Sequence, residues 1–251
     1  MIDVHCHLEQ EDYNNDREDV IKECWKKLSA VITSCAHYKD LELTMEIVKK
    51  YKGFVFCCFG LHPEFIKELN NEKKKEYIQT IEKNKDKIAA IGEIGLDYFW
   101  IKDKEWQEKQ KEMFIEFIEL SKKLNLPIIV HSRDAMHDTL DILEKEGMQN
   151  RKVLLHLFGD KDSLKRVIDH GWSISIGPLI LKNKEIRKIA RDCPIERMMV
   201  ETDSPWFGDG KRGTPLNAIK AAEKIAEIKK ISFAEVEKQT DLNAKAFFSI
   251  K

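Results

Sequence analysis

The sequence predicts a (β/α)8 TIM barrel, and three observations favour this fold. Short apolar runs rich in β-branched residues alternate eight times with longer, charged, amphipathic segments, which is the pattern of strands and helices in such barrels. The runs are apolar on both faces, as expected for parallel strands that are covered on both sides. The length of 251 residues is ordinary for one barrel, so we expect a single domain over residues 1–251.

Each element can be placed in chain order. The expected strands are residues 2–8, 30–34, 54–59, 88–92, 127–130, 152–155, 172–176 and 197–200. The expected helices are residues 16–28, 41–51, 72–84, 104–124, 135–146, 161–170, 184–192, 215–229 and 233–249. Apolar residues recur at helical spacing, as in the stripe formed by Met113, Phe114, Phe117, Leu120 and Leu124. A doubly wound open sheet is the rival fold, but its GxGxxG sequence after the first strand is missing.

Composition narrows the class of protein. Forty-three basic and 44 acidic residues give a net charge of −1, so the whole protein has no general attraction to nucleic acid or to anionic membranes. Six cysteines without a Cys-x-x-Cys pair indicate reduced thiols and not a disulfide framework. The sequence contains no signal-peptide pattern and no stretch long enough to cross a membrane. We therefore expect a cytoplasmic protein without a membrane partner, and the oligomeric state is left open.

His5 and His7 are the first candidate ligands for a metal ion. Residues two apart on a strand point to the same face, so both imidazoles can bind one ion. Two ligands do not complete a site. Because the active sites of (β/α)8 barrels lie at the carboxyl ends of the strands, we expect the missing ligands where later strands end.

Such residues are present at the ends of four later strands. The full candidate set is His5, His7, Glu93, His131, His156 and Asp203. These residues offer more donors than one tetrahedral ion needs, and they suit two ions about 3.5–4 Å apart that share one bridging carboxylate. Glu93, in the middle of the chain order, is the natural bridge. Imidazole and carboxylate ligands together suit zinc, manganese, cobalt or nickel, and magnesium is a further candidate.

Six stretches of the chain resemble the TatD family of metal-dependent deoxyribonucleases, within the amidohydrolase superfamily. They follow one another in family order and span nearly the whole sequence. The stretches are DVHCHL from Asp3, GLHP from Gly60, IGEIGLDY from Ile91, HSRDA from His131, HLFG from His156 and ETDSP from Glu201. The loops after His156 and Asp203 depart from the family pattern, which leaves the substrate preference open.

The resemblance implies a set of ligands and an activity. One ion would be held by His5, His7, Glu93 and Asp203, and the other by Glu93, His131 and His156. Asp203 and Glu93 would be the catalytic carboxylates, with Asp203 orienting or deprotonating the attacking water. The implied reaction is hydrolysis of phosphodiester bonds in DNA. The alternative is an amidohydrolase that cleaves a small ester, amide or lactone, because a fold alone does not fix the substrate.

Two residues are candidates for binding the substrate. Arg133 follows the candidate ligand His131 by two residues, and its planar guanidinium suits a phosphate. His62 precedes Pro63 in a turn and could bind the phosphate or the leaving group. Each residue also has a purely structural interpretation: Arg133 could form a salt bridge with Asp134 or another neighbour, and His62 could make a hydrogen bond within its own loop.

Other polar and aromatic residues lie beside the candidate ligands, and each allows two interpretations. Glu201 could orient a ligand histidine or form a structural ion pair. Asp97 could line the mouth of the barrel or cap a loop. Asp3 is expected on the same face as His5, one layer deeper, in a supporting role. Trp206 and Phe207 could stack on a nucleobase or pack against the rim of the barrel.

Overall fold

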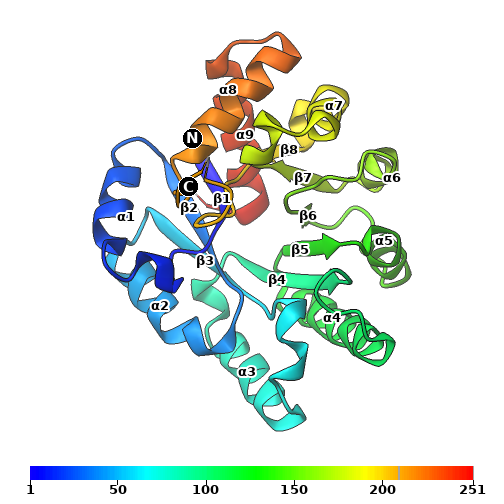
Figure 1. Ribbon diagram of the computed structural model, residues 1–251. Helices are drawn as coiled ribbons and strands as arrows, with labels where there is room; N and C mark the ends of the chain where they lie inside the picture. Colours follow the sequence, from blue (N-terminus) through cyan, green and yellow to red (C-terminus); the bar gives the residue numbers. More distant parts are fainter. Residues whose placement is uncertain (209, 251) are drawn as a thin grey trace.

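The computed structural model describes residues 1–208 and 210–250, which form a barrel of eight parallel strands inside a ring of helices (Figure 1). Each strand pairs with the next one along the chain. The strands are β1 (Ile2–Cys6), β2 (Ala30–Cys35), β3 (Val55–Phe59), β4 (Ala90–Asp97), β5 (Ile128–Arg133), β6 (Val153–Leu155), β7 (Ser173–Ile176) and β8 (Met198–Val200). The predicted (β/α)8 fold is therefore confirmed.

The helices follow the predicted segments within a few residues. They are α1 (Arg17–Trp25), α2 (Leu41–Lys50), α3 (Asn71–Lys83), α4 (Lys104–Leu124), α5 (Met136–Lys145), α6 (Leu164–Asp169), α7 (Lys184–Asp192), α8 (Asn217–Lys229) and α9 (Phe233–Phe248). Side chains that accept backbone N–H groups begin several of them, as Asp103 does for α4 and Asn183 for α7. Helix α9 begins with a full capping box formed by Ser232 and Glu235.

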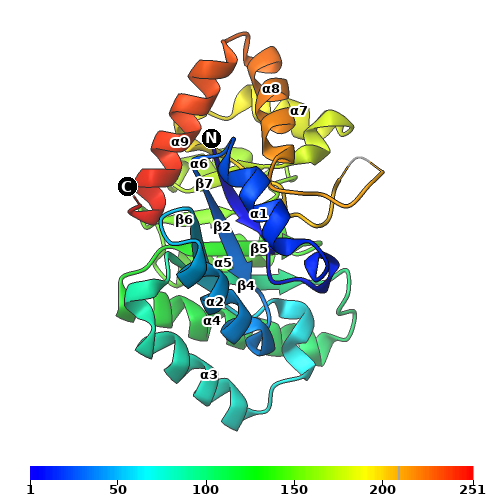
Figure 2. The same ribbon diagram turned by 90° about the vertical axis from the view of Figure 1, so that its left-hand side faces the viewer.

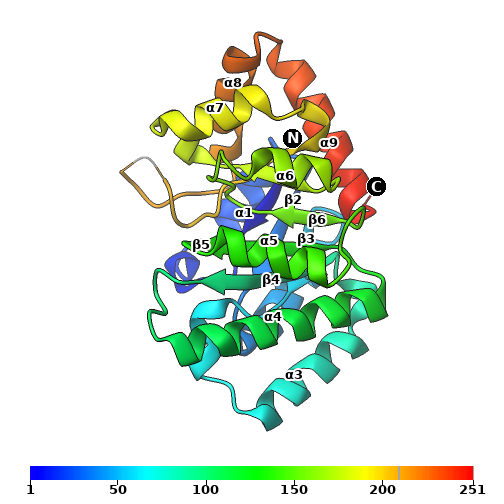
Figure 3. The same ribbon diagram turned by 90° about the vertical axis from the view of Figure 1, so that its right-hand side faces the viewer.

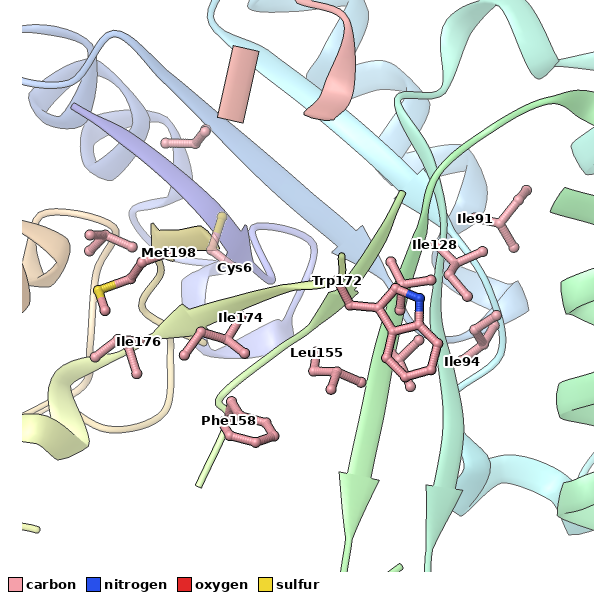
Figure 4. Close-up of a cluster of buried hydrophobic side chains, with 14 of the residues drawn as sticks. Cys6, Ile91, Ile94, Ile128, Leu155, Phe158, Trp172, Ile174, Ile176 and Met198 are labelled. Carbon is pink, nitrogen blue, oxygen red and sulfur yellow. The ribbon is translucent and has the colours of Figure 1, made fainter. Parts of the chain in front are cut away.

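Two apolar clusters stabilise the barrel. The larger one lies between the strands and the helices, and Figure 4 shows a part of it around Ile128, Leu155 and Trp172. The smaller one joins residues from β1 to β6 and from β8, on facing sides of the barrel, so it lies inside the barrel, and Phe247 and Phe248 of α9 pack against it. Its strand residues include Ile2, Val4, Ile32, Ala90, Ile129, Leu154 and Met199. The interior is thus filled by side chains below the level of the candidate ligands.

Backbone hydrogen bonds join the first and last strands at the mouth. The N–H of Asp203 donates to the carbonyl of His5 at 2.9 Å, and the N–H of His7 donates to the carbonyl of Ser204 at 2.8 Å. The strands point toward the end of the barrel where the loop between β8 and α8 projects (Figures 2 and 3). Within the described residues, no helix has the length and apolar character needed to cross a membrane, and the cytoplasmic location stays a prediction.

Removing the ring of Phe117 is expected to destabilise the barrel. Phe117 is fully buried on the inner face of α4, and truncation of such a side chain leaves a cavity. We expect Phe117→Ala to lower the free energy of unfolding by about 3–5 kcal/mol, measured by urea denaturation. The exposed neighbour Glu112 provides the control, since Glu112→Ala should change the same quantity by less than about 0.5 kcal/mol. Equal stability of the two variants would contradict this packing.

Candidate metal centre

Four predicted residues form a first group of donors at the mouth of the barrel. The Nε2 atoms of His5 and His7 lie 3.1 Å apart, and Nε2 of His7 lies 3.1 Å from Oδ1 of Asp203. Nε2 of His5 lies 3.3 Å from Oε2 of Glu93 and 3.5 Å from Oδ1 of Asp203. Ligands of a tetrahedral ion at ordinary zinc distances are about 3.3–3.4 Å apart, so these donors fit around one ion.

A second group shares the same glutamate. Oε1 of Glu93 lies 2.7 Å from Nε2 of His156 and 2.9 Å from Nδ1 of His131. The two histidine nitrogens are 3.2 Å apart. One oxygen of Glu93 therefore faces His131 and His156, whereas the other faces His5 and His7. The structure brings all six predicted ligands together, five of them on strands or directly after a strand end and Asp203 three residues after β8.

Irregular strand pairing in β1 and β4 turns the candidate ligands of these strands toward the interior of the barrel. On β1, Asp3 pairs with Val31 and Cys6 pairs with Thr33, so β1 carries one extra residue. On β4, Ile91 pairs with Ile128 and Ile94 pairs with Val130, again with one extra residue. Such bulges shift the alternation of the side chains. As a result His5 and His7 face the interior although the preceding inward residues are Ile2 and Val4, and Glu93 also turns inward.

The bulge on β1 corrects the expectation for Asp3. Its partner Val31 belongs to the outer cluster, so Asp3 does not share a face with His5. The carboxylate of Asp3 instead accepts the backbone N–H of His5 at 3.2 Å and the hydroxyl of Thr202 at 2.6 Å. Burial raises the pKa of Asp3 well above its usual value. The supporting role expected of Asp3 thus operates through the backbone of β1.

Buried carboxylates contact the ring nitrogens of three candidate ligand histidines on the side away from the shared donor group. Glu9 lies 3.2 Å from Nδ1 of His7, Asp97 lies 3.0 Å from Nε2 of His131, and Glu201 lies 3.3 Å from Nδ1 of His156. Such partners fix the ring orientation and strengthen the ligand. Asp97 also accepts the N–H of Trp100, so it orients a histidine and caps a loop. Glu201 likewise accepts the N–H of Leu157.

Glu9 was missed by sequence reasoning. It follows the expected first strand and carries no ligand spacing of its own, so only its contacts identify it. Its second oxygen accepts the hydroxyl of Thr33 at 2.8 Å, and the same hydroxyl accepts the N–H of Leu8 at 2.9 Å. The one available cue was the alternation His5, His7, Glu9, which continues the inward face beyond the strand.

Opposite charges within the centre shift the pKa values of its buried groups. Burial raises the pKa of Glu93, but His156 and then His5 hold it well below its usual value. Burial lowers the pKa of His7, but its hydrogen bonds with Asp203 and Glu9 raise it well above the usual value. Burial also lowers the pKa of His156, but Glu93 and Glu201 raise it well above the usual value. The acidic groups therefore favour protonated histidines, and a bound cation would compete with these protons.

A cleft of about 660 Å³ lies over the donors and includes both predicted substrate-binding residues. Nδ1 of His62 accepts the N–H of Glu64 at 3.3 Å, while Nε2 faces Glu93 at 3.7 Å. Burial lowers the pKa of His62 to about 3, so its ring is neutral near pH 7 and Nε2 carries a hydrogen. His62 therefore makes the hydrogen bond within its own loop through Nδ1, and it also points an N–H donor into the cleft through Nε2.

Arg133 also lines this cleft, and its guanidinium lies over the ring of Phe99 at 3.8 Å from the centroid. Among the described residues, no carboxylate lies within ion-pair distance of Arg133. The salt bridge with Asp134 that sequence reasoning left open is therefore not formed. The guanidinium keeps its hydrogen-bond donors for a ligand in the cleft.

Comparison with known proteins identifies the family. The family model for "TatD related DNase" matches residues 2–249. The chain is 35% identical to "Deoxyribonuclease TATDN3" of Homo sapiens over 262 residues, which cover 99% of this chain and 94% of that protein. The chain belongs to the TatD family.

Two further matches agree with this assignment. The uncharacterized metal-dependent hydrolase YabD of Bacillus subtilis is 33% identical, and the alignment covers 100% of this chain and 99% of that protein. The crystal structure of a TatD family hydrolase from Entamoeba histolytica superimposes with a TM-score of 0.91 at 25% identity, over 100% of this chain and 98% of that one. These TatD matches confirm the resemblance and the expectation of a metal-dependent hydrolase of the TatD deoxyribonuclease type.

The carboxylate of Glu9 should be needed for tight metal binding. Without it, Nδ1 of His7 loses its partner and the ring is free to rotate. We expect Glu9→Ala to weaken metal affinity about 10- to 100-fold, measured by competition with a chromophoric chelator. Glu11→Ala, two positions later and exposed, should leave the affinity unchanged. A folded Glu9→Ala protein with wild-type affinity would refute this role.

Metal binding should release protons near neutral pH. Hydrogen bonds and charges of neighbouring carboxylates raise the pKa values of His7 and His156 well above the usual value, which favours protonated rings near pH 7, whereas a ligand imidazole must offer a free lone pair. Apparent affinity should therefore fall as the pH decreases. Calorimetric titrations in two buffers of different protonation enthalpy measure the release, and identical apparent enthalpies in both buffers would contradict it.

Proposed function

We propose that residues 1–251 form one catalytic domain that hydrolyses phosphodiester bonds of DNA with two divalent ions. The observation that carries this proposal is the placement of Glu93. Its oxygen Oε2 faces His5 and His7, and its oxygen Oε1 faces His131 and His156. A single ion would leave one of the buried groups without a cation, which is unfavourable for converging carboxylates.

The proposed ligand sets follow the two groups. His5, His7, Glu93 and Asp203 would hold the first ion, and Glu93, His131 and His156 would hold the second. The many imidazole nitrogens favour zinc, manganese, cobalt or nickel over magnesium, which prefers oxygen ligands. When bound, two such ions activate water at neutral pH and offset charge on the phosphoryl oxygens.

Asp203 is the proposed residue that orients the attacking water and accepts its proton. Burial raises the pKa of this carboxyl group, but hydrogen bonds with His5 and His7 hold it far below its usual value. The carboxylate is therefore ionised throughout the neutral range. An ionised carboxylate can accept both a hydrogen bond and a proton from water, so we assign Asp203 to orienting the water and accepting its proton.

His62 and Arg133 are proposed to bind the substrate phosphate. His62 is neutral and presents Nε2–H beside the shared glutamate, which suits donation to a phosphoryl or leaving-group oxygen. Arg133 presents a planar fork of N–H donors, which suits two oxygens of one phosphate. Neither residue is proposed as a metal ligand, so their replacement should spare metal content.

The decisive experiment combines metal analysis with a substrate screen. The purified protein is assayed for bound metals and is then tested on 3′- and 5′-labelled single- and double-stranded DNA, beside RNA and small esters, amides and lactones. We expect about two ions per chain and cleavage of DNA that stops on chelation and returns with a divalent ion. Full activity in the metal-free protein would overturn the proposal, and cleavage of the small esters, amides or lactones alone would favour an amidohydrolase.

Glu93→Gln tests the bridging carboxylate itself. The amide keeps the size of the side chain but removes the charge between the two donor groups, so we expect loss of bound metal and DNA cleavage at background level. Glu76→Gln, on the exposed face of α3, is the matched control and should keep wild-type metal content and rate. Circular dichroism verifies that both variants are folded, and wild-type turnover in Glu93→Gln would end the bridging assignment.

A further inference from the structure

Exposed aromatic rings gather around the mouth of the barrel. Phe99, Trp100, Trp206 and Phe207 are 39%, 57%, 47% and 42% exposed, and among the described residues they are four of six large apolar side chains with such exposure. Three of them, Trp100, Trp206 and Phe207, line the cleft that contains the metal centre. Exposed apolar surface concentrated beside a functional cleft marks a binding surface.

The first aromatic wall belongs to the loop between β4 and α4. The rings of Phe99 and Trp100 meet edge to face with centroids 4.9 Å apart. The guanidinium of Arg133 lies 3.8 Å from the centroid of Phe99 and 5.5 Å from that of Trp100. The backbone N–H of Trp100 donates to Asp97 at 2.7 Å, and Asp97 also holds the ligand His131. This wall is therefore fixed to the metal centre.

The second wall belongs to the loop between β8 and α8, which projects from the same end of the barrel as the first loop (Figure 3). The ring of Trp206 contacts the ring of the ligand His7 edge to face, with centroids 4.9 Å apart. Phe207 follows it and lines both the main cleft and a smaller adjoining hollow. The metal centre thus lies on the floor of the cleft that both walls line.

We propose that these walls are base-stacking subsites that hold unpaired nucleobases beside the scissile phosphate. This inference rests on the proposed function, because the metal centre fixes where the phosphate would lie. Aromatic rings stack on any nucleobase, and a guanidinium adds a cation for the backbone and a planar face for stacking. The wall of Phe99, Trp100 and Arg133 combines these features, whereas a purely apolar partner would leave the charge of Arg133 without a counterion.

The subsites define a class of substrate. Bases inside a duplex are stacked on each other, so an aromatic wall reaches them only when they are unpaired or turned out of the helix. A cleft of about 660 Å³ matches a ligand of drug-like size and not a long groove. Strand ends and single-stranded segments that carry bases should therefore be preferred over strands that lack them.

The test measures equilibrium binding by the metal-loaded enzyme. The probes are a labelled single-stranded oligonucleotide with phosphorothioate linkages and a strand of equal length and backbone in which every nucleotide is abasic. We expect Trp100→Ala to weaken binding of the base-bearing strand about 5- to 150-fold and to leave the abasic strand unchanged. Trp100→Phe, which keeps a ring, should recover most of the affinity, and Phe207→Ala should reproduce the loss.

Trp25→Ala is the matched control, because Trp25 on α1 is 50% exposed but lies outside the main cleft. Metal content is measured in every variant, so that loss of ions is not mistaken for loss of stacking. An equal effect of Trp100→Ala on both strands, or no effect on either, would overturn the inference. A dimer that dissociates on Trp100→Ala, with DNA binding unchanged, would assign this surface to a second copy of the chain and would also overturn it.

The outcome also separates this inference from the proposed function. Discrimination between the two strands that depends on Trp100, without metal-dependent cleavage, would reject the nuclease proposal and retain the subsites. Metal-dependent cleavage without such discrimination would reject the subsites alone.

Discussion

The carboxylate of Glu93 is the constraint on which the centre depends. It is 3% exposed at the mouth of an apolar barrel, where an isolated charge would be very unfavourable. Both oxygens therefore need partners. The fold places two histidines beside each oxygen. The bulge in β4 follows from the same need, because regular alternation from Ile91 would turn Glu93 outward. The bulge in β4 thus allows the buried carboxylate of Glu93 to reach its histidine partners.

Three further carboxylates surround the candidate ligands and fix the orientation of their rings. Glu9, Asp97 and Glu201 each hold a ligand histidine from behind, so acidic and imidazole groups alternate from the metal donors to the surrounding loops. Asp97 extends the chain of contacts to the backbone of Trp100 at the rim. The geometry of the donors and the position of an exposed aromatic ring are thus fixed by one side chain, which couples the chemistry to the surface that would receive a substrate.

The contacts that close the barrel also bring together three donors of the first group. His5 and Asp203 are 198 positions apart in the chain, yet the N–H of Asp203 donates to the carbonyl of His5 and the N–H of His7 donates to that of Ser204. These bonds join the ends of β1 and β8 at the mouth. Asp203 therefore lies beside His5 and His7 because the segment after β8 is joined to the end of β1, while His131 and His156 lie on or directly after the neighbouring strands β5 and β6.

The sequence by itself determined the eight strands, the helices that separate them and the six candidate donors that the fold brings together, because hydrophobic periodicity and strand-end positions are local properties. It also placed His131 and His156 correctly, since β5 and β6 keep regular alternation from Ile129 and Leu154. Only the tertiary structure decided the bulges, the outward turn of Asp3, the role of Glu9 and the stacking of Arg133 on Phe99. Those features depend on partners from other strands and loops, and no periodicity along one segment records them.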